Sequence, residues 1–204
     1  MNGERSRDVK RNADVRRTTK ETDIRLSLTI DGGGEADVRS GNSFMDHMLT
    51  LFARHGLFDL QLVCKGDIEV DFHHSAEDIG ICLGRAVSEA LGDNKGIKRF
   101  GSSFVPMDES LARVCLDICG RANLVYAVTL PDRIVGTFEC DLAEDFFKAF
   151  CDHAAVSMHI DLIRGRNSHH SLEAIFKAFG HALGKGCTIN PRAADQVPST
   201  KGVL

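Results

Sequence analysis

Two short segments of the chain combine histidine and glutamate at spacings suited to metal binding. The segment His73-His74-Ser75-Ala76-Glu77 reappears 96 residues later as His169-His170-Ser171-Leu172-Glu173. In each segment the glutamate follows the histidines by four and three residues, and both spacings place side chains on one helix face. Imidazole and carboxylate together suit divalent manganese, iron, cobalt, nickel or zinc. The repeat therefore predicts metal ligands, whereas one such segment alone is typical of a solvated helix edge.

Adjacent histidines point in different directions, about 100° apart on a helix. One pair can therefore serve two metal ions, and two pairs related by pseudo-symmetry can build a two-metal site. His47 is a further candidate, because the adjacent Asp46 could orient its ring. Asp152-His153 is a poorer counterpart of His47, since it lies 16 residues before His169 whereas His47 lies 26 before His73.

The same offset extends beyond the two motifs and divides the chain into two similar halves, residues 1–93 and 94–204. The further identities at this offset are Ile79 with Ile175, Gly84 with Gly180, and Ala86 with Ala182. Identity fades outside the helix that carries the repeat, so we interpret it as a duplicated fold.

Hydrophobic periodicity predicts the elements of the first half. Alternation over 24–30 predicts a strand, and the segments 57–64 and 68–72 around Lys65-Gly66-Asp67 predict a hairpin. Helical spacing predicts helices over 44–55, ending at Gly56, and over 75–91, with Gly92 after it. The second helix should bury Ile79, Leu83, Ala86, Val87 and Ala90.

The second half repeats this logic. Strands are expected over 100–105, 111–118, 123–130 and 158–163, and helices over 142–154 and 168–183. From Gly184 the chain is polar, contains Pro191 and Pro198, and predicts an irregular tail that closes over substrate.

Composition excludes several classes of protein. The 204 residues are 43% hydrophobic, carry a net charge of −4 and include no apolar run near the ~20 residues of a membrane span. The acidic balance argues against nucleic acid and anionic membranes as partners. Seven cysteines without a C-x-x-C pair predict reduced thiols in a cytoplasmic protein, and residues 1–20 do not resemble a secretory signal.

A cationic set could hold an anion such as phosphate, although ordinary surface charge is the alternative for each member. No glycine-rich phosphate loop is present, so side chains would have to grip the anion. The set comprises Arg99, Arg121, Lys177, Ser199 and Lys201.

These motifs, from about residue 10 to the C-terminus, resemble the imidazoleglycerol-phosphate dehydratase family. The segments that carry the resemblance are Arg17–Thr22, Phe44–Leu49, His55–Leu60, Asp71–Gly80, Pro106–Glu109, His169–Phe179 and Val197–Val203.

The resemblance implies an α+β fold in which each half is of the ribosomal-S5-domain-2-like type, a four-stranded sheet with helices on one face. It implies a 24-subunit homo-oligomer with active sites between subunits. The implied reaction converts D-erythro-imidazole-glycerol phosphate to imidazole-acetol phosphate and water, in histidine biosynthesis. Two manganese ions per active site would bind the substrate imidazole as its imidazolate.

The resemblance also implies residue roles. Glu21 would be the catalytic acid/base and contact substrate, and the cationic set would bind the phosphate. One metal set would comprise His47, His74, Glu77 and His170. The other would comprise His73, His169 and Glu173, with Asp145 or water where family members often place histidine.

Two other functions are compatible with parts of the sequence. In a non-catalytic protein the histidines would only join subunits through metal, with saturated coordination. An RNA-binding module is possible because S5-like folds occur in ribosomal proteins, but fold does not carry function. Glu21 and the cationic set argue against the first, and the acidic balance with few aromatic residues argues against the second.

Overall fold

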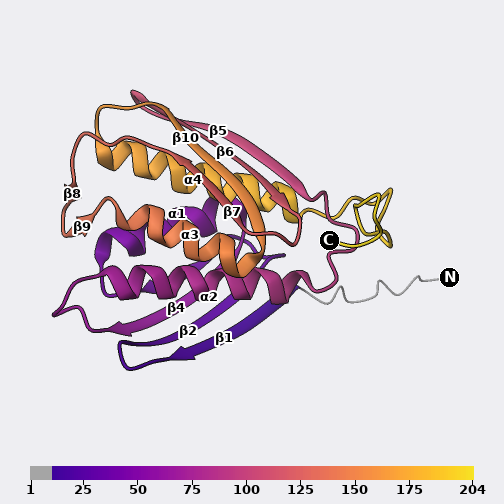
Figure 1. Ribbon diagram of the computed structural model, residues 1–204, viewed down its shortest axis with the longest axis horizontal. Coiled ribbons are helices and arrows are strands. Elements are labelled where there is room, and N and C mark those ends of the chain that lie inside the picture. The colour runs from indigo at the N-terminus through magenta and orange to yellow at the C-terminus, as the bar shows by residue number, and fades with distance from the viewer. Residues whose placement is uncertain (1–10) are drawn as a thin grey trace.

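The computed structural model describes residues 11–204, which form two four-stranded sheets with four helices between them (Figure 1). The part of the first half before Arg11 lies outside the described residues. The first sheet and its helices are β1 (Asn12–Thr18), β2 (Thr22–Thr29), β3 (Ala36–Arg39), α1 (Ser43–Gly56), β4 (Asp59–Gly66) and α2 (His73–Leu91). The second set is β5 (Phe100–Met107), β6 (Ser110–Ile118), β7 (Asn123–Ala127), β8 (Ile134–Val135), β9 (Phe138–Glu139), α3 (Leu142–Ala154), β10 (Val156–Arg164) and α4 (Ser168–Cys187).

Both sheets have the same topology. The strand orders are β1-β2-β4-β3 and β5-β6-β10-β7, and in each order only the last pair is parallel. The two-stranded β8-β9 hairpin precedes α3 and belongs to the second half alone. The predicted α+β fold with two similar halves is therefore confirmed.

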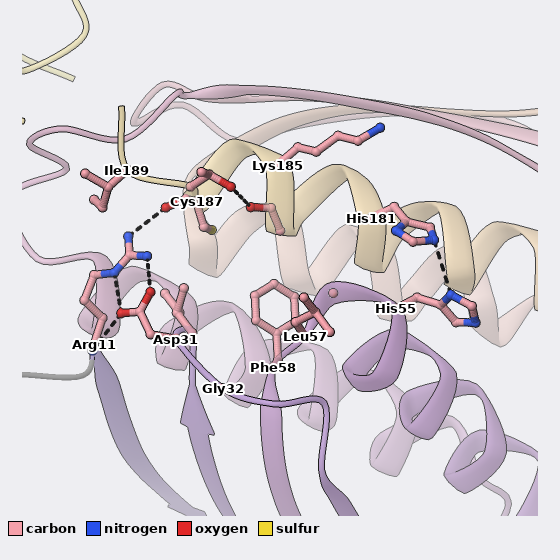
Figure 2. Close-up of a pocket in the computed structure, with 14 residues that line it drawn as sticks. Arg11, Asp31, Gly32, His55, Leu57, Phe58, His181, Lys185, Cys187 and Ile189 are labelled. Atoms are coloured by element: carbon pink, nitrogen blue, oxygen red, sulfur yellow. Dashed lines mark hydrogen bonds and ion pairs between the residues drawn. The ribbon is translucent and has the colours of Figure 1, made fainter. Parts of the chain in front are cut away.

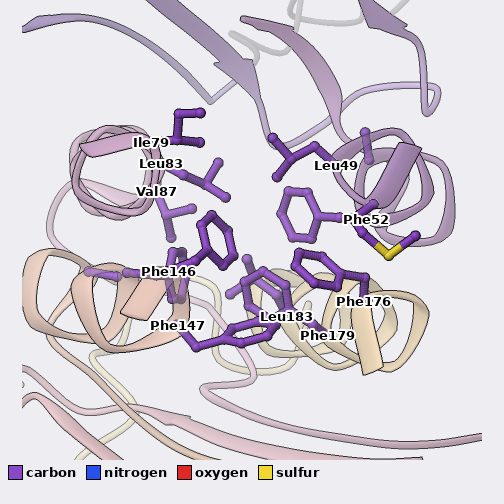
Figure 3. Close-up of a cluster of buried hydrophobic side chains, with 14 of the residues drawn as sticks. Leu49, Phe52, Ile79, Leu83, Val87, Phe146, Phe147, Phe176, Phe179 and Leu183 are labelled. Atoms are coloured by element: carbon purple, nitrogen blue, oxygen red, sulfur yellow. The ribbon is translucent and has the colours of Figure 1, made fainter. Parts of the chain in front are cut away.

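The four helices bury a core rich in phenylalanine. Phe52 of α1, Phe147 of α3 and Phe179 of α4 are all fully buried and meet at the centre (Figure 3). The Phe52 and Phe179 rings stack with centroids 4.7 Å apart, and Phe147 meets Phe179 edge-on at 5.3 Å. Burial of this kind contributes roughly 1.5–3 kcal/mol per large apolar side chain.

Two glycines let helices from different halves approach closely. A Cβ added at Gly84 of α2 would lie 2.6 Å from Phe150 O in α3, and one at Gly180 of α4 would lie 2.5 Å from Phe52 O in α1. Each motif helix therefore packs on a helix of the other half. Side chains from both halves therefore meet at each motif.

The predicted strand over 68–72 is wrong. Both edges of β4 are already occupied, by β2 and β3, so no partner is left for a hairpin strand. Residues 67–72 form a loop in which Ile68 and Val70 are exposed. Hydrophobic periodicity does not predict β1 or β3, because only Ala13 and Val15 are buried in β1 and no residue is buried in β3.

Several predicted ends shift by a few residues. α2 begins at His73, α4 continues to Cys187, β7 stops at Ala127 and β10 extends over 156–164. The left-handed residue after α1 is Leu57, with φ 59°, instead of Gly56. Gly56 is needed within the helix because a Cβ there would clash with the Phe58 ring and approach Gly180 O.

Candidate metal centre

His47, His169 and Glu173 form a cluster where α1 of the first half crosses α4 of the second. Glu173 Oε1 lies 2.8 Å from His47 Nε2 and 3.1 Å from His169 Nε2. One potential ligand atom from each residue lies within 4.8 Å of the others. Two imidazole nitrogens and a carboxylate are a suitable donor set for a divalent transition metal.

Lys177 helps to keep the Glu173 carboxylate of this cluster ionised. Its ammonium lies 2.5 Å from Glu173 Oε2 and 3.4 Å from Met107 Sδ. Burial raises the pKa of Glu173, but hydrogen bonds from the ammonium and the two imidazoles outweigh it and lower the pKa to about 2. The carboxylate is therefore ionised at neutral pH, as a metal ligand must be.

The first-half motif has an equivalent but different neighbourhood. Asp145 of α3 follows His47 by 98 residues, the same offset that relates Phe52 to Phe150 at the helix contacts. Asp145 Oδ2 lies 3.4 Å from His73 Nδ1. Glu77 is exposed and makes no ion pair or hydrogen bond within residues 11–204. His153, the poorer candidate, bonds instead to Ala149 O.

One chain groups the candidate ligands differently from the two sets that the resemblance implies. It brings His47 to His169 and Glu173, which the resemblance places in the other set. Within residues 11–204, no hydrogen bond, ion pair or ring contact joins His47 to His74, Glu77 or His170.

The second histidine of each motif is bound at Nδ1 by a carboxylate. Asp67 Oδ2 lies 3.0 Å from His74 Nδ1, and Glu109 Oε2 lies 2.9 Å from His170 Nδ1. These hydrogen bonds raise the pKa of both histidines and lower the pKa of Glu109 to about 2. Glu109 and Asp108 lie close enough to His170 to form a second possible ligand group.

Glu21 directly precedes β2, and its half-exposed carboxylate lies 3.9 Å from His74 Nε2. Buried Asp78 of α2 fixes this region by accepting hydrogen bonds from Arg17 and from Thr22, the residue after Glu21. Sequence patterns alone assign no role to Asp67, Asp78 or Glu109. Glu109 stands in one of the segments that carry the resemblance, whereas Asp67 stands in none.

The cationic set divides between the two ends of α4. Lys177 lies at the metal cluster, whereas the Arg99 backbone N–H donates to Gly186 O near the C-terminal end. Gly186 follows Glu173 by 13 residues, so the two lie about 20 Å apart along the helix.

The C-terminal tail is irregular from Thr188, four residues later than predicted because α4 continues to Cys187, and hydrogen bonds hold it to the body. Arg99 pairs with Asp117 and donates to Pro198 O at 2.9 Å, and Gly96 N donates to Gln196 O. Ser199 Oγ accepts from Lys201 N, and the Lys201 side chain is exposed. Arg121 is exposed and adjacent to Gly120, whose backbone lies against Leu204.

A cavity of about 450 Å³ lies at the junction of the halves, away from the candidate ligands (Figure 2). His55 Nδ1 and His181 Nε2 are 3.2 Å apart at one end of it, and Arg11 pairs with Asp31 at the other. Burial lowers the pKa of both histidines. Both rings are therefore predominantly neutral at pH 7, and one can donate to the other.

Fold and site together define a class: a duplicated α+β protein with candidate divalent-metal ligands where its halves meet. No helix in the described part of the chain is long and apolar enough to span a membrane.

Comparison with known proteins identifies the family. The family model described as imidazoleglycerol-phosphate dehydratase matches residues 40–183. Proteins of that name from Nitrosomonas eutropha and Heliobacterium modesticaldum are 50% and 53% identical over 194 residues, 95% of this chain and all of each relative. The Staphylococcus aureus enzyme structure has a TM-score of 0.80 at 41% identity, covering 88% of this chain and 99% of that one. The Pyrococcus furiosus structure has a TM-score of 0.81 at 35% identity, covering 93% and 100%.

The chain therefore belongs to the imidazoleglycerol-phosphate dehydratase family, and it is a hydro-lyase of histidine biosynthesis.

Proposed function

We propose that this chain converts D-erythro-imidazole-glycerol phosphate to imidazole-acetol phosphate and water, with two manganese ions in each active site. The observation that carries the metal proposal is the cluster of His47, His169 and ionised Glu173, whose donors fit a divalent transition metal. When bound, manganese would supply Lewis acidity and hold the substrate imidazole as its imidazolate. We assign the remaining ligand positions to His73, His74, Glu77, Asp145 and His170.

Glu21 is the proposed acid/base. Dehydration removes the hydroxyl from the carbon next to the ring and a proton from the neighbouring carbon, giving an enol that becomes the ketone. A carboxylate that takes this proton must be accessible to substrate, and Glu21 is half-exposed beside His74. Positioned proton transfer contributes about 10²–10⁴-fold to the rate.

The substrate phosphate would bind Arg99, Arg121, Ser199 and Lys201, away from the candidate metal ligands, together with Lys177, the one member that lies beside Glu173. Charged and hydroxyl donors of this kind suit phosphate oxygens. Binding energy at the phosphate would hold the reacting carbons near the metal ligands. We also propose that the tail closes over substrate, so deletion of residues 197–204 should raise KM while folding and metal content remain.

The separation of these groups supports a site formed between subunits. The Arg99 backbone bonds to Gly186 of α4, which lies about 20 Å from Glu173 along the helix, far more than the three-carbon chain of the substrate can span. A neighbouring chain in a 24-subunit shell would supply one of the two groups. The seven cysteines are all free, which suits the reducing cytoplasm that we propose as its location.

Manganese binding and turnover of imidazole-glycerol phosphate test this function together. Metal-free protein should be inactive and should recover activity with Mn²⁺. His169→Gln should weaken Mn²⁺ binding, whereas His159→Gln, at an exposed position on β10, should not. Full turnover by metal-free protein would contradict the metal proposal, and no turnover of this substrate with any divalent metal would contradict the reaction.

A further inference from the structure

We propose that Asp67 and Glu109 are positioning residues that fix the ring orientation of His74 and His170. Each carboxylate accepts the Nδ1–H of its histidine, which leaves Nε2 as the metal-ligating atom. This inference rests on the proposed metal function and deepens it.

The two contacts are nearly the same although they lie in different halves. The Nδ1-to-carboxylate distances are 3.0 Å for His74 and 2.9 Å for His170. The carboxylates have matching side-chain exposures of 23% for Asp67 and 24% for Glu109. A neutral imidazole that donates from Nδ1 carries its lone pair on Nε2, so each contact selects one tautomer and one orientation.

Different parts of the two halves supply these carboxylates. Asp67 follows Gly66, where an added Cβ would clash with Ser75 Oγ of the first motif. Gly165 has the same relation to Ser171 Oγ of the second motif, but the next residue there is Arg166. Because a guanidinium cannot accept a hydrogen bond, the second half needs a carboxylate from elsewhere.

That carboxylate comes from Glu109, in the turn between β5 and β6. Glu109 directly precedes β6 and bonds to His170, and Glu21 directly precedes the equivalent strand β2. In the first half Asp67 already occupies His74 Nδ1, so Glu21 is left half-exposed, 3.9 Å from Nε2. The two halves make the same contact of a carboxylate with histidine Nδ1, but they supply the carboxylate from different segments. This favours a functional role for the contact. The two contacts also explain why only one of the two turn glutamates is available for proton transfer.

Titration of the metal-free protein with Mn²⁺, followed by electron paramagnetic resonance of the free ion, tests the positioning role. Asp67→Ala and Glu109→Ala should each weaken Mn²⁺ binding about 10–100-fold, the usual effect of removing such a partner. Asp67→Asn and Glu109→Gln retain an oxygen that can accept from Nδ1, so they should lose less affinity. Glu69→Ala removes an exposed carboxylate two residues from Asp67 and should bind Mn²⁺ like the unmodified protein.

The melting temperature of each metal-free variant separates positioning from folding. The proposal expects affinity to fall while this temperature stays within the range of the Glu69→Ala control. Alanine variants that bind normally, equal losses for alanine and amide variants, or a loss that tracks metal-free melting would each overturn it. If the unmodified protein binds no Mn²⁺, the proposed metal function itself fails, and that result is distinct from all of these.

Discussion

The two halves present the same motif in different electrostatic surroundings. Glu173 is 7% exposed and lies among His47, His169 and Lys177, whereas Glu77 is exposed to solvent. At the 96-residue offset, Ile81 stands in the first half where Lys177 stands in the second. On the facing helices, at an offset of 98 residues, Asp145 of α3 is the counterpart of His47 of α1. The second-half cluster thus pairs a carboxylate with cationic or neutral partners, while the first-half motif lies near a second carboxylate.

The backbone does not share this divergence. Gly84 and Gly180 admit a neighbouring helix at nearly the same distance, and both sheets have the same strand order. The shared fold therefore fixes where the candidate ligands lie, while single side-chain replacements determine the charge and the available partners at each motif.

The largest expected effect concerns Glu21 and Glu109, which lie in the turns directly before β2 and β6. Glu21→Gln keeps the size and removes the charge, so turnover should fall about 10²-fold or more while Mn²⁺ and substrate binding persist. Glu109→Gln should reduce turnover less, because Glu109 is bound to His170 instead of facing substrate. Steady-state kinetics with saturating Mn²⁺ measures both. Near-normal turnover by Glu21→Gln would remove this glutamate from the mechanism.

Helix packing should respond alike in the two halves. Gly84→Ala and Gly180→Ala each place a methyl group against a backbone oxygen, which should cost about 1–3 kcal/mol. For a chain of this size, each kcal/mol lowers the melting temperature by roughly 2–4 °C. Gly33→Ala is a suitable control, since its nearest neighbour would be 3.8 Å away. Loss of stability in one half only would show that the halves are not packed equivalently.

The strength of a local pattern determined how much could be predicted from the sequence. The long periodic helices, the duplicated motif and the two-half architecture were predictable because period and repeat are local signals. β3 has no fully buried residue to reveal it, and the false strand over 68–72 required knowing that both edges of β4 are occupied. The contact of Glu109 with His170 joins residues 61 apart, so only the folded chain shows it.

Replacing Asp145 by histidine, or His47 by aspartate, should change the preference of the site between Zn²⁺ and Mn²⁺. Carboxylates favour hard ions such as Mn²⁺, whereas imidazole favours Zn²⁺ and Ni²⁺. Asp145→His should therefore raise Zn²⁺ affinity relative to Mn²⁺ on the order of tenfold, about 1.4 kcal/mol. His47→Asp should shift the ratio the other way. Competition titrations of the two ions measure it, and an unchanged ratio in both variants would show that neither residue ligates metal.

The smallest expected effect is a pH dependence at the cavity between the halves. The pKa values of His55 and His181 lie below their ordinary value of 6.5, so the neutral rings stabilise the fold above pH 6.5. That stabilisation should be lost as pH falls from 6.5 toward the lowered values. His74 and His170 have raised pKa values and contribute in the opposite direction, with stability lost as pH rises.

Thermal melting at pH 7.5 and 5.5 separates these contributions. His181→Gln should reduce the fall in melting temperature on acidification, because one of the two rings that resist protonation is removed. His159→Gln should leave the fall unchanged. An equal response of both variants would exclude the cavity pair as its source.

Subunit complementation tests the central claim, that catalysis needs groups from different chains. Glu21→Gln and Lys201→Ala remove the proposed acid/base and a proposed phosphate ligand, which are assigned to separate parts of the site. Co-expression with two affinity tags yields mixed oligomers, whose turnover of imidazole-glycerol phosphate is compared with that of each pure variant. We predict turnover above that of both pure variants, because some mixed sites receive an intact Glu21 from one chain and an intact Lys201 from another. Turnover equal to the weighted mean of the two variants would contradict a site shared between subunits.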